Sequence, residues 1–279
     1  LFQQIDNQCN SLYDQRIKPV INATGIILHT NMGRSPLPEK VWNDCKGVNV
    51  GYSNLELSLG NGKRGKRNGL LPQLISELTG AEASLIVNNN AAAILLTLTA
   101  LAKNRKVIVS RGEQVQIGGG FRIPEILKLS GTGLIEVGTT NITTAEDYLN
   151  AVTEDTAIIL KVHRSNFALR GFTKEPNIIE ITSKLPENII TVVDQGSGVI
   201  DEDLPGETKV ESYLKSGADI VTFSADKIIG GPQAGIIVGS KDLITIIEKH
   251  PLARTYRPGK TIYSLLESVL INRLTSIIP

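Results

Sequence analysis

The sequence predicts an α/β fold: a mostly parallel sheet with helices on both faces. The first observation is that, from residue 84 onward, short apolar runs alternate with segments of helical periodicity, as in successive βαβ units. The second is that glycines precede several apolar runs, where a helix commonly ends: Gly80, Gly131, Gly133 and Gly217. In such a fold ligands bind at the carboxyl ends of the strands, so residues that follow the apolar runs are candidates for a site.

The expected elements follow the chain in order. We expect strands at 84–87, 107–110, 134–137, 157–162, 189–193 and 220–223, and a further strand at 235–239 that pairs with the preceding one. We expect helices at 91–102, 123–129, 144–152, 177–183, 210–215 and 241–249. The segment 258–279 also has helical apolar spacing. The first eighty residues are less regular, with loops at 33–38 and 60–69.

This pattern predicts three parts: a linker over 1–25, a large domain over 26–257, and the start of a C-terminal domain over 258–279. The net charge of +1 gives no global electrostatic reason for binding nucleic acid or membrane. Cys9 and Cys45 are far apart, and His29 and His250 lack ligand spacing, so we expect neither a disulfide framework nor a metal site. No run is long enough to span a bilayer and no signal peptide is recognisable, so a cytoplasmic protein is expected.

Lys227 is the first candidate for chemistry. It follows the apolar strand expected at 220–223, and Gly230, Gly231 and Pro232 come after it. An amine held there in one orientation and partly desolvated favours its neutral, nucleophilic form, as a Schiff-base lysine requires. The alternative is a solvated lysine after a strand, which is the more common case when the residue is taken alone.

Two further features indicate a pyridoxal phosphate (PLP) site. Asp194 ends the apolar strand at 189–193, at the same expected sheet edge as Lys227, and a carboxylate there would keep the cofactor's pyridine nitrogen protonated. Asparagines 88–90 precede small residues where a helix begins, so Asn89, Asn90 and Ala91 are expected to hold the phosphate. The alternatives are a turn-capping aspartate and a plain asparagine N-cap.

Several stretches resemble bacterial selenocysteine synthases, the L-seryl-tRNA(Sec) selenium transferases. They are INATGIILHTNMGRSPL, YSNLELSLGNGKRGKR, SRGEQVQIGGGFRIPEI, LKVHRSNF, VVDQGSG and TFSADKIIGGPQAG. The resemblance runs from about Ile17 to the end and implies the large domain of a fold-type I PLP-dependent transferase. It also implies that Lys227 is the Schiff-base lysine, that Asp194 is the pyridine partner, and that the protein is a homo-oligomer, a ring of dimers.

The resemblance further implies a reaction. Seryl-tRNA(Sec) would lose its α-proton and β-hydroxyl to give a dehydroalanyl intermediate, which would accept selenium from selenophosphate. Selenophosphate is a small anion that guanidinium groups suit, and Arg254 and Arg257 match the family's anion-binding pair. Arg34 and Arg64 align with further arginines of that site, whereas for the neighbouring Lys63, Lys66 and Arg67 we favour a solvated position.

Supporting roles are open at several positions. Asp226 is a candidate acid or base in the elimination, or else a turn residue. Ser224 is expected to give the cofactor a hydroxyl, and His163 to bond cofactor or substrate, with a structural histidine as the alternative. Arg122 is a weaker candidate for a phosphate or RNA contact.

The sequence departs from the family's usual pattern at three places. Gln195 stands where an apolar residue is expected, Gly60 and Asn61 replace a more acidic pair, and Tyr256 with Pro258 and Gly259 interrupts a regular stretch. The family also has a small N-terminal tRNA-binding domain and a C-terminal domain, and this sequence matches neither the first nor most of the second. We therefore expect it to be part of a longer chain.

Two other functions remain open. One is a related PLP-dependent lyase that acts on a free amino acid. The other is a PLP-binding relative that holds tRNA or a partner without turnover. A lyase of free amino acids needs an arginine to bind the α-carboxylate of its substrate. An aminoacyl ester has no free α-carboxylate, so a selenium transferase does not need that arginine.

Overall fold

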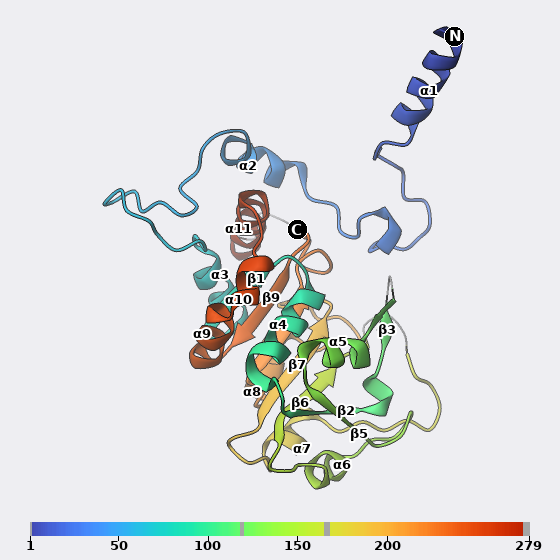
Figure 1. The fold of residues 1–279 in the computed structure, drawn as a ribbon, viewed down its shortest axis with the longest axis vertical. Helices are drawn as coiled ribbons and strands as arrows, with labels where there is room; N and C mark the ends of the chain where they lie inside the picture. Colours follow the sequence, from blue (N-terminus) through green and yellow to red (C-terminus); the bar gives the residue numbers. More distant parts are fainter. Residues whose placement is uncertain (1, 118–119, 165–167, 276–279) are drawn as a thin grey trace. The chain divides into compact units, whose positions relative to one another are not determined.

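The computed structural model describes residues 2–117, 120–164 and 168–275, and the chain divides into two compact units, Leu1–Arg34 and Ser35–Pro279 (Figure 1). The first unit holds helix α1 (Phe2–Asp14) and the 3-10 helix η1 (Thr30–Met32). The second unit holds the sheet and the helices that cover it. The domain limits expected at 25/26 and 257/258 stay predictions.

Seven strands of the second unit form one sheet, in the order β1-β9-β8-β7-β6-β2-β5. They are β1 (Ala83–Val87), β2 (Lys106–Ser110), β5 (Gly133–Val137), β6 (Thr156–Val162), β7 (Ile190–Gly196), β8 (Ile220–Ser224) and β9 (Gly235–Gly239). The pairs from β8 to β5 are parallel, whereas β9 is antiparallel to both β1 and β8. The mostly parallel sheet, and the pairing of 235–239 with the preceding strand, are therefore confirmed.

Successive residues of the central strands alternate between two apolar layers, because side chains of a strand point to opposite faces. Val192 and Ile220 join one cluster with helices α4 (Asn90–Ala102), α5 (Ile123–Ser130) and α9 (Lys241–Lys249). Val193 and Val221 join the opposite cluster with helices α3 (Leu71–Thr79), α8 (Val210–Lys215) and α11 (Lys260–Leu274). Helices on both faces are thus confirmed (Figure 1).

The shorter elements complete the second unit. Helices α6 (Ala145–Asn150) and α7 (Ile178–Thr182) pack on Ile108 and Ile159. A 3-10 helix η2 (Arg111–Glu113) follows β2, and β3 (Gln116–Ile117) pairs with β4 (Phe121–Arg122). Helix α10 (Pro251–Thr255) lies between α9 and α11. No helix of the described residues is long and apolar enough to cross a membrane.

The first eighty residues contain more helix than the sequence pattern indicated. Helices α1, α2 (Glu39–Val50) and α3 were not predicted. In α2 only Val41 and Cys45 are buried, and α1 has no buried residue. The helix expected within 258–279 is confirmed as α11, which packs against α2 and α3.

Two of the four glycines expected to end helices do so. Gly80 and Gly131 are the C-caps of α3 and α5, with φ of 69° and 76° in the left-handed region that glycine adopts without strain. Gly217, with φ of 92°, follows the C-cap residue of α8. The expectation is wrong for Gly133, which is the first residue of β5.

Candidate active site

Three candidate residues lie near the carboxyl ends of neighbouring strands, at the same edge of the sheet. Val162, at the end of β6, pairs with Asp194 on β7, and Asp194 pairs with Thr222 on β8. His163 comes directly after β6, and its backbone NH donates to the Asp194 carbonyl at 2.9 Å. Lys227 lies three residues beyond the end of β8. The parallel register therefore brings the carboxyl ends of these strands together.

Asp194 is a buried carboxylate, with 5% of its surface exposed. The Asn90 side-chain amide donates to its Oδ1 at 2.7 Å. Burial raises the pKa of Asp194, because the charged form loses water, while the Asn90 bond and the positive charge of Lys227 partly offset this. The charge of Lys227 thus acts on the Asp194 carboxylate.

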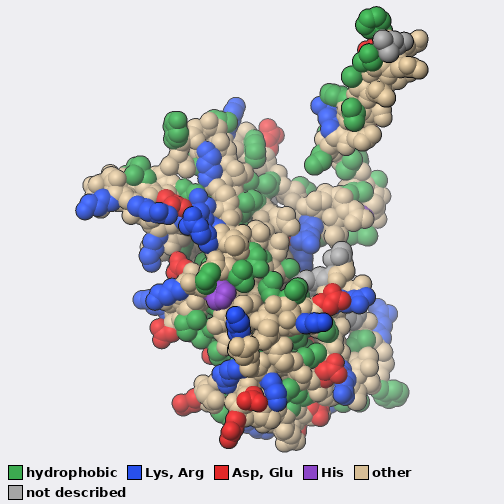
Figure 2. Space-filling view, viewed as in Figure 1, with side chains coloured by type: hydrophobic (Ala, Val, Ile, Leu, Met, Phe, Trp, Pro, Cys, Tyr) green, Lys and Arg blue, Asp and Glu red, His purple; other side chains and the backbone are tan. Residues whose placement is uncertain are grey.

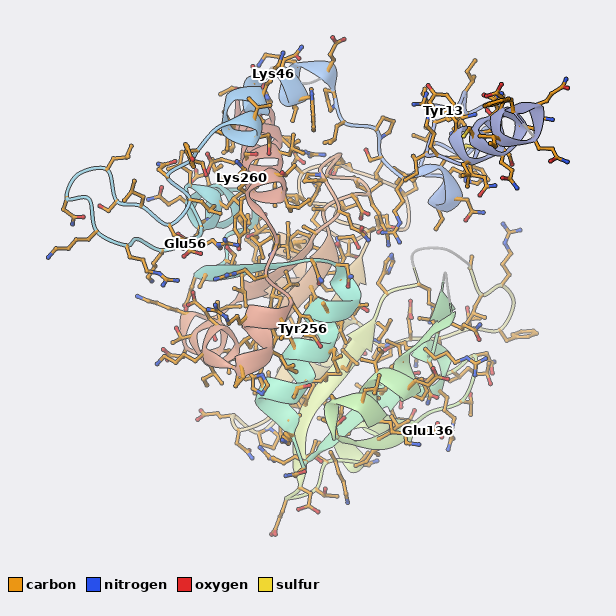
Figure 3. The ribbon with its side chains drawn as sticks, turned by 45° about the horizontal axis from the view of Figure 1, so that its top comes forward. Tyr13, Lys46, Glu56, Glu136, Tyr256 and Lys260 are labelled. Atoms are coloured by element: carbon orange, nitrogen blue, oxygen red, sulfur yellow. The ribbon has the colours of Figure 1, made fainter. Side chains whose placement is uncertain are left out.

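The three asparagines at the start of α4 make three different contacts. Asn89 is the N-cap, and its side chain accepts from the Ala92 backbone NH at 2.8 Å. Asn90 reaches Asp194 instead, and the Asn88 backbone NH donates to the Tyr256 carbonyl at 2.9 Å. Figure 3 labels Tyr256 in this part of the molecule. A plain N-cap therefore accounts for Asn89 only, and the first turn of α4, with Ala91, joins the same edge of the sheet as Asp194.

The turn that carries Lys227 is held by backbone bonds. The Ala225 NH donates to the Ala234 carbonyl at 2.9 Å, and the Gly231 NH to the Ala225 carbonyl at 2.8 Å. Ser224 and Asp226 are both buried, and Lys227 is partly buried. The amine of Lys227 thus projects from a fixed backbone, which is the condition set for a nucleophilic lysine.

Gln195 organises the loop after β7. This fully buried side chain donates from Nε2 to the carbonyls of Val199 and Thr208, at 3.0 and 2.9 Å, and accepts from the Gly198 NH at 2.8 Å. Gly198 has φ of 78°, and a Cβ there would lie 2.5 Å from the Ser224 carbonyl oxygen. The polar residue found where the family pattern suggests an apolar one is therefore satisfied, and it holds this loop close to the end of β8.

Glu207 was missed from the sequence and lies beside His163. Its Oε2 is 3.1 Å from His163 Nε2 and accepts from Ser197 Oγ at 2.7 Å. Burial acts to raise the pKa of Glu207, but His163, Ser197 and the charge of Lys227 outweigh it, and the pKa is lowered. Glu207 lies in an irregular acidic segment, DEDLPGETK, whose pattern gives no signal for a site.

A buried polar atom of this cluster, Asn90 Oδ1, has no hydrogen-bond partner among the described residues. Buried polar groups are usually satisfied, and exceptions in a native fold commonly face a ligand. The cluster therefore has unused bonding capacity where PLP is expected.

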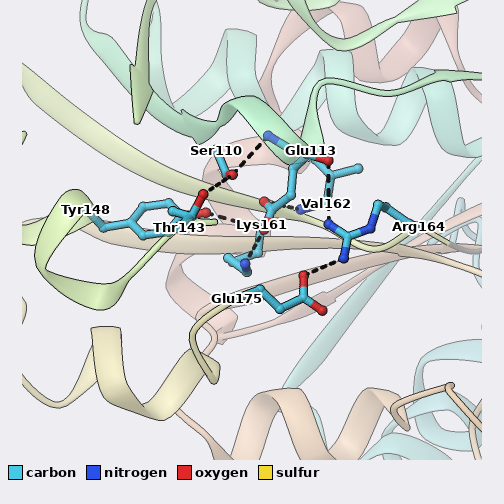
Figure 4. A network of polar contacts seen from close by, with 9 residues as sticks. Ser110, Glu113, Thr143, Tyr148, Lys161, Val162, Arg164 and Glu175 are labelled. Atoms are coloured by element: carbon cyan, nitrogen blue, oxygen red, sulfur yellow. Dashed lines mark hydrogen bonds and ion pairs between the residues drawn. The ribbon is translucent and has the colours of Figure 1, made fainter. Parts of the chain in front are cut away.

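A second buried charge cluster supports the end of β6. Glu113, 2% exposed, is ion-paired with Lys161 and accepts from Tyr148 Oη at 3.3 Å and from the Val162 NH at 3.0 Å (Figure 4). Burial and Glu113 raise the pKa of Tyr148. A cavity of about 120 Å³ borders Glu113. Glu113 thus anchors the backbone one residue before His163, and it too was missed from the sequence.

The expected anion-binding arginines are in different settings. Arg64 and Arg257 both contact Glu56, together with Arg67. Arg67 is only 25% exposed and also donates to the Pro258 carbonyl at 2.9 Å, so its expected solvated position is wrong. Lys63 and Lys66 are exposed, as expected. Lys and Arg side chains gather on the loop before α3 in Figure 2.

The other candidate cations lie elsewhere. Arg254 is an exposed residue of α10. Arg34 is the last residue of the first unit, where its backbone NH donates to the His29 carbonyl at 3.1 Å. Arg122 bonds Gln116 and Glu125 on the surface. The roles of Arg254, Arg34 and Arg122 in binding ligands stay predictions.

Known structures are similar to this chain in fold. A D-glucosaminate-6-phosphate ammonia-lyase superposes with a TM-score of 0.72 and 23% identity, covering 97% of this chain and 70% of its own. A serine palmitoyltransferase variant from S. paucimobilis, with a bound PLP-myriocin aldimine, has a TM-score of 0.65 and 12% identity, covering 99% and 75%. The fold is that of fold-type I PLP-dependent enzymes.

Sequence comparison gives the family. An L-seryl-tRNA(Sec) selenium transferase of Geotalea daltonii is 45% identical over 275 residues, which are 97% of this chain and 60% of that relative. The chain thus spans less than two thirds of that relative's length. The family model of L-seryl-tRNA selenium transferase matches residues 20–276. This chain therefore belongs to the L-seryl-tRNA selenium transferase family.

Proposed function

We propose that this chain binds PLP, with Lys227 as its covalent attachment and Asp194 at the pyridine nitrogen. The supporting observation is the juxtaposition of these two side chains at one sheet edge, beside the N-terminus of a 13-residue helix suited to a phosphate. Bound PLP would act as an electron sink for carbanion chemistry at the substrate α-carbon. Asn89, Asn90, Ala91, Ser224 and His163 line the remainder of the proposed site.

Asp194 has the clearest role in this proposal. Its burial and its bond from Asn90 fix the carboxylate in place, and a positively charged partner at that position would stabilise its ionised form. A protonated pyridine nitrogen is such a partner. The unused bonding capacity of Asn90 Oδ1 also supports a polar ligand between the strand ends.

We further propose that the complete protein converts seryl-tRNA(Sec) to selenocysteinyl-tRNA(Sec), with selenophosphate as the selenium donor. Family membership is the observation that carries this proposal. Asp226, next to the lysine, is the proposed group that moves a proton during loss of the β-hydroxyl. Arg254 and Arg257, with Arg34 and Arg64, are proposed to bind selenophosphate. A homo-oligomer in the cytoplasm, and the three parts 1–25, 26–257 and 258–279, belong to the same proposal.

The test offers seryl-tRNA(Sec) and selenophosphate to the full-length protein loaded with PLP and measures selenocysteinyl-tRNA(Sec). We expect product with both substrates present and none when either is left out. Release of ammonia and pyruvate from free serine, without transfer to tRNA, would instead favour a lyase. PLP and tRNA binding with no turnover of either substrate would favour the binding relative.

The cofactor assignment has its own test. Lys227→Ala removes the amine that would attach the cofactor, so we expect the visible absorbance of the holoprotein to be lost while the fold is kept. Lys215→Ala, which removes an exposed lysine of α8, is the matched control and should leave the spectrum unchanged. An unaltered spectrum in Lys227→Ala would remove Lys227 from the proposed role.

A further inference from the structure

Three guanidinium groups converge on the carboxylate of Glu56. Arg67 Nε lies 2.6 Å from Oε1, Arg257 Nη1 lies 3.4 Å from the same oxygen, and Arg64 Nη2 lies 2.9 Å from Oε2. We refer to Glu56, Arg64, Arg67 and Arg257 as the Glu56 cluster. Figure 3 labels Glu56 on the loop before α3.

Local backbone structure forms the cluster. The Gly65 NH donates to the Glu56 carbonyl at 3.0 Å, the Ser58 NH donates to the Lys63 carbonyl at 2.9 Å, and Leu57 and Arg64 form an isolated antiparallel bridge. This hairpin turns the chain back on itself and brings Arg64 beside Glu56. Arg67 connects the hairpin to the segment between α10 and α11 through its bond to the Pro258 carbonyl.

The cluster carries more positive charge than its carboxylate neutralises. Hydrogen bonding to Arg67, with the charges of all three arginines, lowers the pKa of Glu56, so this carboxylate is ionised at neutral pH. Three positive charges then face one negative charge. Each guanidinium has five N–H donors, and the contacts described above use only one or two of each. The cluster thus has both the charge and the donors for a more highly charged anion.

We propose that Glu56 is an exchangeable internal anion, and that a tetrahedral oxyanion of the phosphate class binds Arg64, Arg67 and Arg257 by displacing it. This proposal rests on the proposed function in taking selenophosphate as the physiological oxyanion. It adds Arg67 to the proposed donors and gives Glu56 a role in specificity.

The exchange has a physical consequence for ligand choice. A monoanion such as chloride only replaces one negative charge with another, whereas a dianion brings greater attraction and several acceptor oxygens for the guanidinium forks. Glu56 is 26% exposed at its side chain and Arg64 75%, so the released carboxylate regains water at little cost. Glu56 therefore selects for dianions by competing with every weaker ligand.

The test is a calorimetric titration of the PLP-loaded protein with inorganic phosphate at constant ionic strength, without tRNA. Glu56→Gln keeps the side-chain shape and removes the competing charge, so we expect about tenfold tighter phosphate binding. Arg67→Met should weaken phosphate binding by about tenfold or more. Glu211→Gln, which removes an equal charge from an exposed pair with Lys215 on α8, is the control and should bind as the original chain does.

A second variant guards against a folding defect in the first. Glu56→Asp keeps the charge on a shorter side chain that cannot reach all three arginines, so its phosphate affinity should lie between those of the original chain and Glu56→Gln. The proposal predicts that phosphate affinity is highest for Glu56→Gln, intermediate for Glu56→Asp and lowest for the original chain. If a folded Glu56→Gln binds phosphate no more tightly than the original chain, or if Glu56→Asp breaks this order, Glu56 is a fixed structural ion pair and the proposal is wrong.

The outcome is separable from that of the proposed function. Phosphate binding at the Glu56 cluster needs no seryl-tRNA(Sec), so tighter binding by Glu56→Gln with no selenium transfer by the full-length protein would reject the reaction alone. Transfer by the full-length protein with the wrong order of phosphate affinities would reject the exchange alone.

Discussion

The strand-end cluster around Asp194 and the Glu56 cluster both bring opposite charges together, but they are built in different ways. Asp194 is 5% exposed and lies within the paired strands of the sheet. Glu56 lies in a hairpin loop and is 26% exposed, and its partners range from 25% exposed for Arg67 to 75% for Arg64. Burial makes a charge expensive to leave unpaired, whereas an exposed ion pair contributes little to stability and exchanges readily. The first cluster is suited to hold a cofactor permanently, and the second to bind and release a substrate.

The largest expected effect is on the rate of selenium transfer, which should depend on the arginines that are proposed to bind selenophosphate. We expect the double variant Arg254→Ala with Arg257→Ala to lower transfer by about 1,000-fold, because two charge-assisted contacts to the oxyanion are lost. The same variant should bind PLP with an unchanged visible spectrum, since neither arginine belongs to the strand-end cluster. Transfer assays and absorbance spectra of the full-length protein measure the two effects.

Arg122→Ala removes a surface arginine on β4 and is the control for that double variant. Its transfer rate should match that of the original protein. If the double variant keeps its transfer rate, these arginines do not bind the donor and the proposed division of roles between the two regions is wrong.

Asp194→Asn tests the cost of the buried carboxylate. Because the pKa of Asp194 is raised in the folded state, the cost of burying its charge is absent below the unfolded value of 3.8 and is complete above the folded pKa. At neutral pH the neutral amide should therefore stabilise the cofactor-free protein by about 1–3 kcal/mol. Thermal melting at pH 7 without PLP measures this gain, and a melting temperature below that of the original protein would contradict it.

Glu207→Gln should have the smallest effect of these variants, and it should lower the stability of the fold where Asp194→Asn raises it. The pKa of Glu207 is lowered in the folded state, so its stabilising contribution is present above the unfolded value of 4.5 and is lost as pH falls through the folded pKa. The variant should lose up to about 1 kcal/mol at pH 7, since solvent screens this partly exposed group. The difference should vanish in strong acid, and Glu187→Gln, at an exposed loop position, should show none at either pH.

The sheet could be predicted closely from the sequence because its strands are buried on both faces and read as continuous apolar runs. The positions of Asp194 and Lys227 at one edge follow from strand ends alone. Glu207, Glu113 and Glu56 could not be found in this way. Their partners are separated from them in sequence by irregular loops, and no local periodicity records which arginine, lysine or histidine a loop carboxylate will meet.

Helices α2 and α3, in the first eighty residues, were also missed, because the helix against which they pack is distant in the sequence. Residues of α2 and α3 are buried by α11, which lies about two hundred residues further along the chain. The packing of α2 and α3 thus depends on a distant partner that their own residues do not identify. Gln195 is a third example, because its three backbone partners turn a polar residue into a suitable core residue.

Strand β9 follows the turn that carries Lys227, and its first residue packs against the start of α4. Its first residue, Gly235, packs so closely that an added Cβ would lie 2.2 Å from the Asn89 carbonyl oxygen. Its last residue, Gly239, would bring a Cβ within 2.0 Å of the Asp219 carbonyl oxygen. A methyl group at Gly235 would therefore push the start of β9 away from the asparagines with which the lysine-bearing turn is proposed to share one ligand, whereas one at Gly239 would press on the opposite end of the strand.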